Sequence, residues 1–184
     1  MGFDIEAFSI QFDGGARAYL FEYAPNIKGI AYNEDNKIYV KATSLPSTSI
    51  EEHMIEYQGV NYKMGGKKTF EDWTVTFNLD KDGQLRKDFE AWTQLVQEIK
   101  EDGTMIHKYP SNYVLDQYFY MLGTLDIGLD PMNLDISISN EPKILEIKLY
   151  NAWPKSISPI SLDYSSQDFA QFDVTFSYLY HIIV

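Results

Sequence analysis

Three histidines, His53, His107 and His181, are the side chains best suited to acid–base or metal chemistry at neutral pH. A metal site needs such side chains at a set spacing, as in HExxH, where both histidines lie on one helix face. These three match no such spacing. The chain also has no cysteine, which excludes disulfides, thiol nucleophiles and cysteine-bound metals. The sequence therefore predicts no metal site.

Residues 78–83 (NLDKDG) begin like a calcium-binding loop, with a glycine at the sixth position. The twelfth position, where such a loop needs a bidentate glutamate, is Phe89, and Glu90 misses that position by one. The segment also follows a predicted strand rather than a helix. The interpretation adopted is a turn in which Asp82 caps the following helix.

Paired carboxylates occur at Glu51-Glu52 and Glu71-Asp72, and such pairs can perform general acid–base catalysis when they converge on one substrate. Adjacent residues of a strand point to opposite faces, so neither pair converges. The chain contains no Gly-x-Ser-x-Gly nucleophile elbow, no phosphate-binding P-loop and no dinucleotide-binding GxGxxG motif. We therefore predict a protein that is not an enzyme and binds no cofactor.

The composition favours a single folded domain that is rich in β-structure. A chain of 184 residues fits one domain, and its 14 Tyr and 11 Phe suit pleated, half-buried surfaces. The net charge of −12 argues against nucleic-acid binding, which needs a basic surface on the phosphates. Such a charge serves either simple solubility or a surface that must not adhere to DNA.

The start of the chain, residues 1–10, alternates apolar and polar side chains and includes Asp4 and Glu6. It lacks the basic start and the apolar run of a signal peptide. No apolar run in the sequence approaches the ~20 residues of a membrane span. We therefore expect an intracellular product without a membrane anchor.

Alternation of apolar and polar residues predicts a series of strands. The clearest covers 68–79, where Trp73, Val75 and Phe77 share one face and Asp72, Thr74, Thr76 and Asn78 share the other, which suits water or a lumen. Gly65-Gly66 is expected to form the turn before it. Further strands are predicted over 18–23, 37–43, 49–58, 60–64, 134–139, 144–150 and 172–180, with one or two more within 113–129.

A change of periodicity predicts one helix after these first strands. Apolar residues recur at spacings of 3 and 4 over about four turns, namely Leu85, Phe89, Trp92, Leu95 or Val96, and Ile99. Gly103 lies where a glycine that ends the helix belongs. The expected fold class is therefore mostly β (α+β), a small β-barrel or sandwich with one flanking amphipathic helix. The expected core comprises Phe70, Trp73, Phe77, Phe89, Trp92 and Phe176, rather than these aromatics forming a ligand cage.

A series of short segments resembles one family. The segments are 41–46 (KATSLP) with 49–52 (SIEE), 57–65 (YQGVNYKMG), 69–77 (TFEDWTVTF), 86–92 (RKDFEAW), 151–154 (NAWP), 157–162 and 172–178 (FDVTFSY), with a weaker match at 17–22. Together and in this order they resemble the tail tube proteins of phages with contractile (myovirus-type) tails. Residues 103–131 look longer and more aromatic than the family pattern and are a candidate insertion in a single domain that spans 1–184.

The resemblance implies a structural subunit of the inner tail tube. Such subunits close into hexameric rings, and the rings stack into a tube within the virion, after assembly in the bacterial host cytoplasm. The implied partners are further copies of the chain, the tail sheath protein, and the baseplate and tail terminator proteins. The tape-measure protein and later the DNA pass through the channel, and an acidic channel repels phosphates so that DNA slides without specific binding.

Two groups of residues are predicted to serve this assembly. The candidates for lining the lumen are Glu51, Glu52, Glu56 and Asp72, with an exposed outer face as the alternative position. The candidates for contact with the adjoining ring are Thr43, Ser44, Leu45, Pro46 and Ser47, with a simple turn as the alternative interpretation.

Other functions remain open at this point. The same family includes tube subunits of phage-derived secretion or toxin-injection systems. A different class is a monomeric β-barrel that binds a small ligand in a closed apolar cavity. A calcium-dependent module or an unrecognised hydrolase ranks last.

Overall fold

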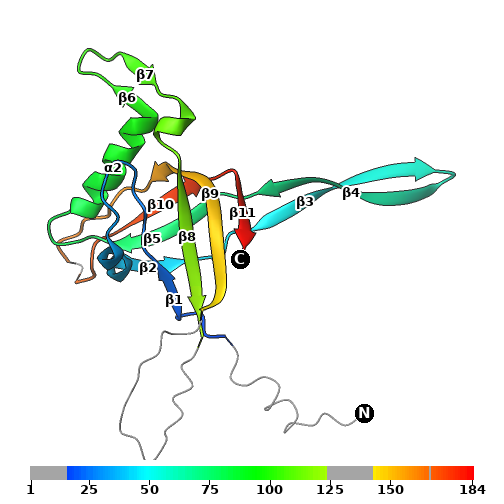
Figure 1. Cartoon of the computed structure of the whole chain (residues 1–184), viewed down its shortest axis with the longest axis horizontal. Helices are drawn as coiled ribbons and strands as arrows, with labels where there is room; N and C mark the ends of the chain where they lie inside the picture. The colour runs from blue at the N-terminus through cyan, green and yellow to red at the C-terminus, as the bar shows by residue number, and fades with distance from the viewer. Residues whose placement is uncertain (1–15, 124–142, 166) are drawn as a thin grey trace, which may run out of the picture.

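The computed structural model describes residues 16–123, 143–165 and 167–184. Strands dominate this described part of the chain, which contains one α-helix, so the expected class is confirmed (Figure 1). In chain order the elements are β1 (Phe21–Tyr23), η1 (Glu34–Tyr39), β2 (Val40–Thr43), β3 (Thr48–Tyr57), β4 (Val60–Phe70), β5 (Trp73–Asn78), α2 (Gln84–Val96), β6 (Gln97–Ile99), β7 (Met105–His107), η2 (Pro110–Asn112), β8 (Leu115–Leu122), β9 (Lys143–Ile157), β10 (Gln171–Ser177) and β11 (Tyr180–Ile183).

The body is a sandwich in which both layers share the long strand β9. The first part of β9, up to Ala152, pairs with β8, and residues 147–150 pair with β11. From Trp153 on, just after Asn151 with its φ of 54°, β9 pairs instead with β10. We call β1-β8-β9-β11 the first layer and β9-β10-β5-β2 the second layer.

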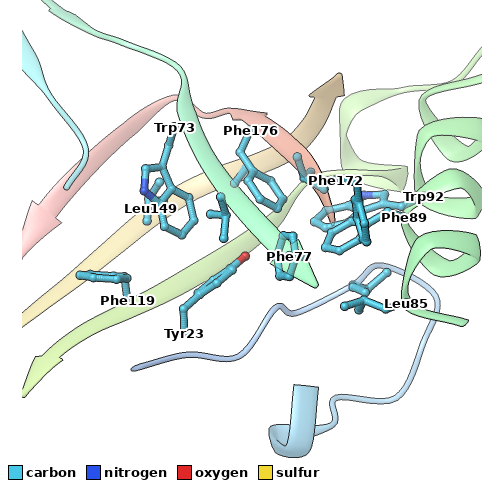
Figure 2. Close-up of a cluster of buried hydrophobic side chains, with 14 of the residues drawn as sticks. Tyr23, Trp73, Phe77, Leu85, Phe89, Trp92, Phe119, Leu149, Phe172 and Phe176 are labelled. Carbon is cyan, nitrogen blue, oxygen red and sulfur yellow. The ribbon is translucent and has the colours of Figure 1, made fainter. Parts of the chain in front are cut away.

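An aromatic core fills the space between these layers and the helix (Figure 2). The alternation predicted for β5 holds, since Trp73, Val75 and Phe77 are all at most 1% exposed. Phe89 and Trp92 seat α2 on the strands, where the Phe89 ring lies 5.1 Å from Phe77. Phe176 is fully buried, and its ring lies 5.6 Å from that of Trp73.

Phe70, which the sequence placed in the core, lies at the core's margin. It is only partly buried, and its ring contacts Tyr178 and His181 rather than the buried aromatics. The predicted strand 68–79 is in fact two strands, because Glu71 and Asp72 separate β4 from β5. Phe70 therefore belongs to the last position of β4, outside the sandwich.

Several predicted boundaries differ from the structure. Gly65-Gly66 is no turn but lies inside β4, beside a register shift against Ile50 and Glu52 of β3. A Cβ on Gly66 would lie 3.1 Å from the Glu51 carbonyl oxygen and against the His53 ring, so glycine permits this close strand approach. The strand expected over 37–43 begins only at Val40, after the 3₁₀ turn η1.

The helix is shorter than predicted, and a different residue caps it. It ends at Val96, and Ile99 lies in β6, which forms a small hairpin with β7. Gly103, with a φ of 81°, lies in the turn of that hairpin. The Asp80 carboxylate, not Asp82, accepts hydrogen bonds from the backbone N–H groups of Gln84 and Leu85, at 2.7 and 3.2 Å.

The candidate insertion 103–131 contains elements of different kinds. Its first part holds β7 and η2, near the end of the helix, whereas β8 lies within the first layer between β1 and β9. Residues 124–131, the strand predicted over 134–139 and the start of the chain lie outside the described residues.

The assignment of the cap to Asp80 predicts a clear difference between neighbouring carboxylates. Asp80→Ala is expected to lower the free energy of unfolding by about 1 kcal/mol, since it removes both cap hydrogen bonds. Asp82→Ala is the matched control, expected within about 0.5 kcal/mol of wild type. Urea unfolding measures both, and an equal loss for the two variants would contradict the assignment.

Candidate assembly surfaces

The most prominent surface of this chain is a long β-hairpin that projects from the sandwich (Figure 1). β3 and β4 pair with each other and with no other described strand. They turn through Gln58 and Gly59, whose φ values of 50° and 77° fit a two-residue hairpin loop. Not one residue of either strand is buried. We call this hairpin, residues 48–70, the arm.

The two faces of the arm differ in character. Paired residues of an antiparallel ladder share a face. Ile55 is opposite Tyr62, and Tyr57 is opposite Val60, so these apolar side chains lie together with His53 and Met64. The other face carries Glu52, Met54, Glu56, Asn61 and Lys63, with Lys63 3.1 Å from the Glu52 carboxylate.

The apolar face of the arm has no partner among the described residues. Its side chains are 47–70% exposed, from Met64 at the lower end to Tyr57 at the upper. A contiguous exposed apolar surface on a free hairpin is typical of a protein interaction site, because water solvates it poorly and unpaired strand edges join other strands. The pattern was present in the sequence as alternation over 53–57 and 60–64.

The predicted lumen acids do not form one cluster. Glu52 and Glu56 share the polar face of the arm, while Glu51 lies on the opposite side of β3. Asp72 lies where β4 gives way to β5, and its carboxylate pairs with Lys155 of β9 at 2.5 Å. The structure therefore places two of the four on one surface.

The outer face of the second layer is covered by short polar side chains, which we call the hydroxyl face. Thr74 and Thr175 lie within hydrogen-bond distance across β5 and β10, and the Thr76 hydroxyl donates to Asp173 at 2.6 Å. These four side chains bond to one another, so this face presents mostly short polar groups. Its members are Thr74, Thr76, Asn78, Ser156, Asp173 and Thr175.

The outer face of the first layer is quite different. Tyr150 stacks on Tyr180 at 4.6 Å, and the Lys148 ammonium lies 4.4 Å from the Tyr150 ring. Lys148 also pairs with Asp116 at 2.9 Å, and that hydrogen bond raises the pKa of the lysine. This face is rich in tyrosines and its charged side chains include paired ones, and aromatic residues are enriched where proteins meet.

The loop 43–47 joins β2 to the arm and is held at several points. The Trp73 indole N–H donates to the Ser44 carbonyl at 2.7 Å, and the Thr43 hydroxyl donates to the Thr74 carbonyl at 3.0 Å. Pro46 is half-buried, whereas the Leu45 side chain is 48% exposed. The loop is thus an ordered element that presents one apolar side chain.

The three histidines lie on separate elements of the fold. Within the described residues, no group of three or more His, Asp or Glu side chains is arranged to hold a metal ion. His53 lies on the arm, and His107 lies on β7. His181 contacts the base of the arm, a role that its isolated position in the sequence did not indicate.

His181 belongs to a small cluster at that base. Burial, with Lys68 nearby, holds the pKa of His181 below its usual value. Burial, with Asp72 and Glu71, raises the pKa of Tyr178 to about 12. Both side chains are therefore neutral at pH 7. No helix in the described part of the chain is long and apolar enough to cross a membrane.

Comparison with known sequences identifies relatives. The family model for "Phage tail tube protein" matches residues 5–184. The chain is similar to tail tube protein gp19 of Enterobacteria phage T4, with 25% identity over 138 residues, or 73% of this chain and 74% of the relative. The gp19 protein of Enterobacteria phage T6 matches to the same extent.

Solved structures with the same fold come from a prophage particle and from a contractile injection system. The cap of the anti-feeding prophage gives a TM-score of 0.61 at 12% identity, over 92% of this chain and 90% of that one. Its sixfold-symmetrised baseplate gives 0.55 at 13%, over 89% of both chains. The PVC sheath–tube complex of an extracellular contractile injection system gives 0.53 at 16%, over 100% and 99%.

Proposed function

Because this chain belongs to the phage tail tube protein family, it is a non-enzymatic tube subunit of a contractile phage tail or a related injection system, and we propose that its arm builds the tube. The observation that carries the proposal is the unpartnered apolar face of the arm. A second copy of the chain supplies the surface that covers it. Repeated around an axis, such a head-to-tail contact closes into rings, here hexameric, that stack.

The hydroxyl face of the second layer is our candidate for the bore. A channel that passes a polyanion needs a surface on which cations are absent or paired with acids. The hydroxyl face supports this assignment, because its threonines bond to each other and to Asp173. The nearby Lys63 and Lys155 are paired with Glu52 and Asp72. The overall charge of −12 adds repulsion of phosphates.

The arm contributes acids to the same bore. When its apolar face is seated on a neighbour, the opposite face with Glu52 and Glu56 stays in water. Asp72 lies at the edge of the hydroxyl face, whereas Glu51, on the other side of β3, is not part of this surface. The tape-measure protein and then the DNA occupy this channel without specific binding.

The partners follow from the place of such a tube in its machine. The structural neighbours occur in a sheath–tube complex, a baseplate and a cap. We propose that a tail sheath surrounds the tube that this chain forms, with a baseplate at one end of the tube and a terminator at the other. The tyrosine-rich face of the first layer suits contact with these proteins or with adjacent subunits. The proposed location of this protein is therefore the tail of the virion.

A tube of an extracellular injection system is the alternative assignment. The alignment with the PVC sheath–tube chain covers 100% of this chain. It supports the alternative through similarity of fold alone. The two assignments share every assembly surface described above and differ only in the cargo. Capsid and terminase genes beside the coding sequence would identify a phage.

The arm assignment predicts that Tyr62→Ser weakens assembly. Loss of an aromatic side chain from the apolar face is expected to raise the protein concentration needed for rings and tubes by roughly tenfold or more. Light scattering and negative-stain electron microscopy measure this. Met54→Ser is the matched control, because Met54 is similarly exposed but on the polar face. Equal effects of the two variants would refute the arm's apolar face as the contact.

The bore assignment predicts where a new cation causes retention of DNA. Thr175→Lys places an ammonium on the hydroxyl face, so assembled tubes are expected to retain a short oligonucleotide at low salt and release it as salt rises. Ile144→Lys is the control on the outer face of the first layer, where Ile144 is 53% exposed. Stronger retention by the control would place the bore on the first layer instead.

The loop 43–47 is our candidate for contact between rings. Leu45→Ser removes its exposed apolar side chain and keeps the hydrogen bonds of Ser44 and Thr43. We expect single rings in place of stacked tubes, with thermal unfolding unchanged. Electron microscopy distinguishes these forms, and tubes of normal length from the variant would exclude the loop.

A further inference from the structure

The arm is joined to the sandwich by two short links only. The ladder of β2 and β5 ends at Thr43 opposite Val75, and the ladder of the arm begins at Thr48 opposite Phe70. Between them lie residues 44–47 and 71–72. A ribbon attached in this way pivots at its links unless side chains at its base hold it.

The C-terminal strand β11 supplies such side chains. In Figure 1 its end lies beside the base of the arm. The Nε2 atom of His181 lies 3.4 Å from the Thr48 hydroxyl, on the first strand of the arm. The His181 ring also meets Phe70, on the second strand, edge to face at 5.2 Å. A single side chain thus contacts both strands at their origin.

Neighbouring contacts hold His181 itself in place. Its Nδ1 atom lies 3.2 Å from the Tyr178 hydroxyl, and Tyr178 packs against the core. The backbone of His181 pairs with Leu149, which is fully buried. The imidazole is therefore anchored to the rigid sandwich on one side and touches the arm on the other.

We propose that His181 is a positioning residue, which holds the arm at one angle to the sandwich through Thr48 and Phe70. The inference rests on the proposed role of the arm in tube assembly. An arm that samples many directions must lose that freedom when it binds the next subunit, and this loss opposes assembly. An arm that is already held in one direction avoids this loss. We call the contacts of His181 with Thr48 and Phe70 the joint. The joint therefore lowers the protein concentration at which tubes form.

Single-molecule energy transfer tests the joint without any need for assembly. The chain has no cysteine, so Asn61→Cys on the arm and Gln94→Cys on α2 place two dyes specifically. His181→Ala is expected to broaden the distribution of transfer efficiencies and shift its mean. His181→Phe, which keeps a ring against Phe70, is expected to lie between wild type and His181→Ala. Ile182→Ala, an exposed neighbour on the other face of β11, is the control and should leave the distribution unchanged.

Thermal unfolding of the same variants is the control for an intact sandwich. A second measurement, the concentration needed for tube formation, tests whether the joint matters for assembly. His181→Ala is expected to raise the concentration for tube formation about tenfold, which corresponds to roughly 1.4 kcal/mol per subunit. An unchanged efficiency distribution in His181→Ala, or equal broadening in Ile182→Ala, would overturn the joint. A broadened distribution without any change in assembly would uphold the joint and instead contradict the proposed role of the arm.

Discussion

A two-stranded ribbon cannot cover its own apolar side chains, and this constraint governs the function of the chain. In the arm, Tyr57 and Tyr62 share a face with Ile55 and Val60, and no described residue lies over them. Their burial against another molecule is worth on the order of several kcal/mol. A monomer therefore leaves this apolar face uncovered, and we propose that a further copy of the chain covers it, as suits a member of the tail tube family.

The sandwich gives the arm a base and divides the remaining surface. Because β9 passes from one layer to the other at Asn151, one chain presents two unlike sheet faces. One face carries threonines and Asp173 that bond to each other. The other carries Lys148 and tyrosines in cation–π contact. In the tube that we propose, the first of these faces lines the bore and the second contacts other subunits or other proteins.

Strong periodicity made much of the fold predictable, and local competition explains what was not. Trp73, Val75 and Phe77 alternated and are buried, and Phe89 and Trp92 recurred at helical spacing and seat α2. The helix ended early because residues 97–99 pair with β7, and Asp80 rather than Asp82 reaches the first N–H groups. The two strands of the arm were predicted, but alternation of apolar and polar residues does not show that these strands pair only with each other. His181 was unremarkable in sequence because its contacts, with Thr48 and Phe70, are distant in the chain.

Hydrogen–deuterium exchange across the arm tests the central claim most directly, by comparing the dispersed protein with assembled tubes. The account predicts that amides of residues 48–70 exchange faster than those of β5 in the dispersed protein. In tubes they gain protection to a level near that of β5, since a neighbouring subunit then covers the apolar face. Arm amides that exchange equally fast in both states, while tubes are present, would show that the arm is not the contact and would contradict the account.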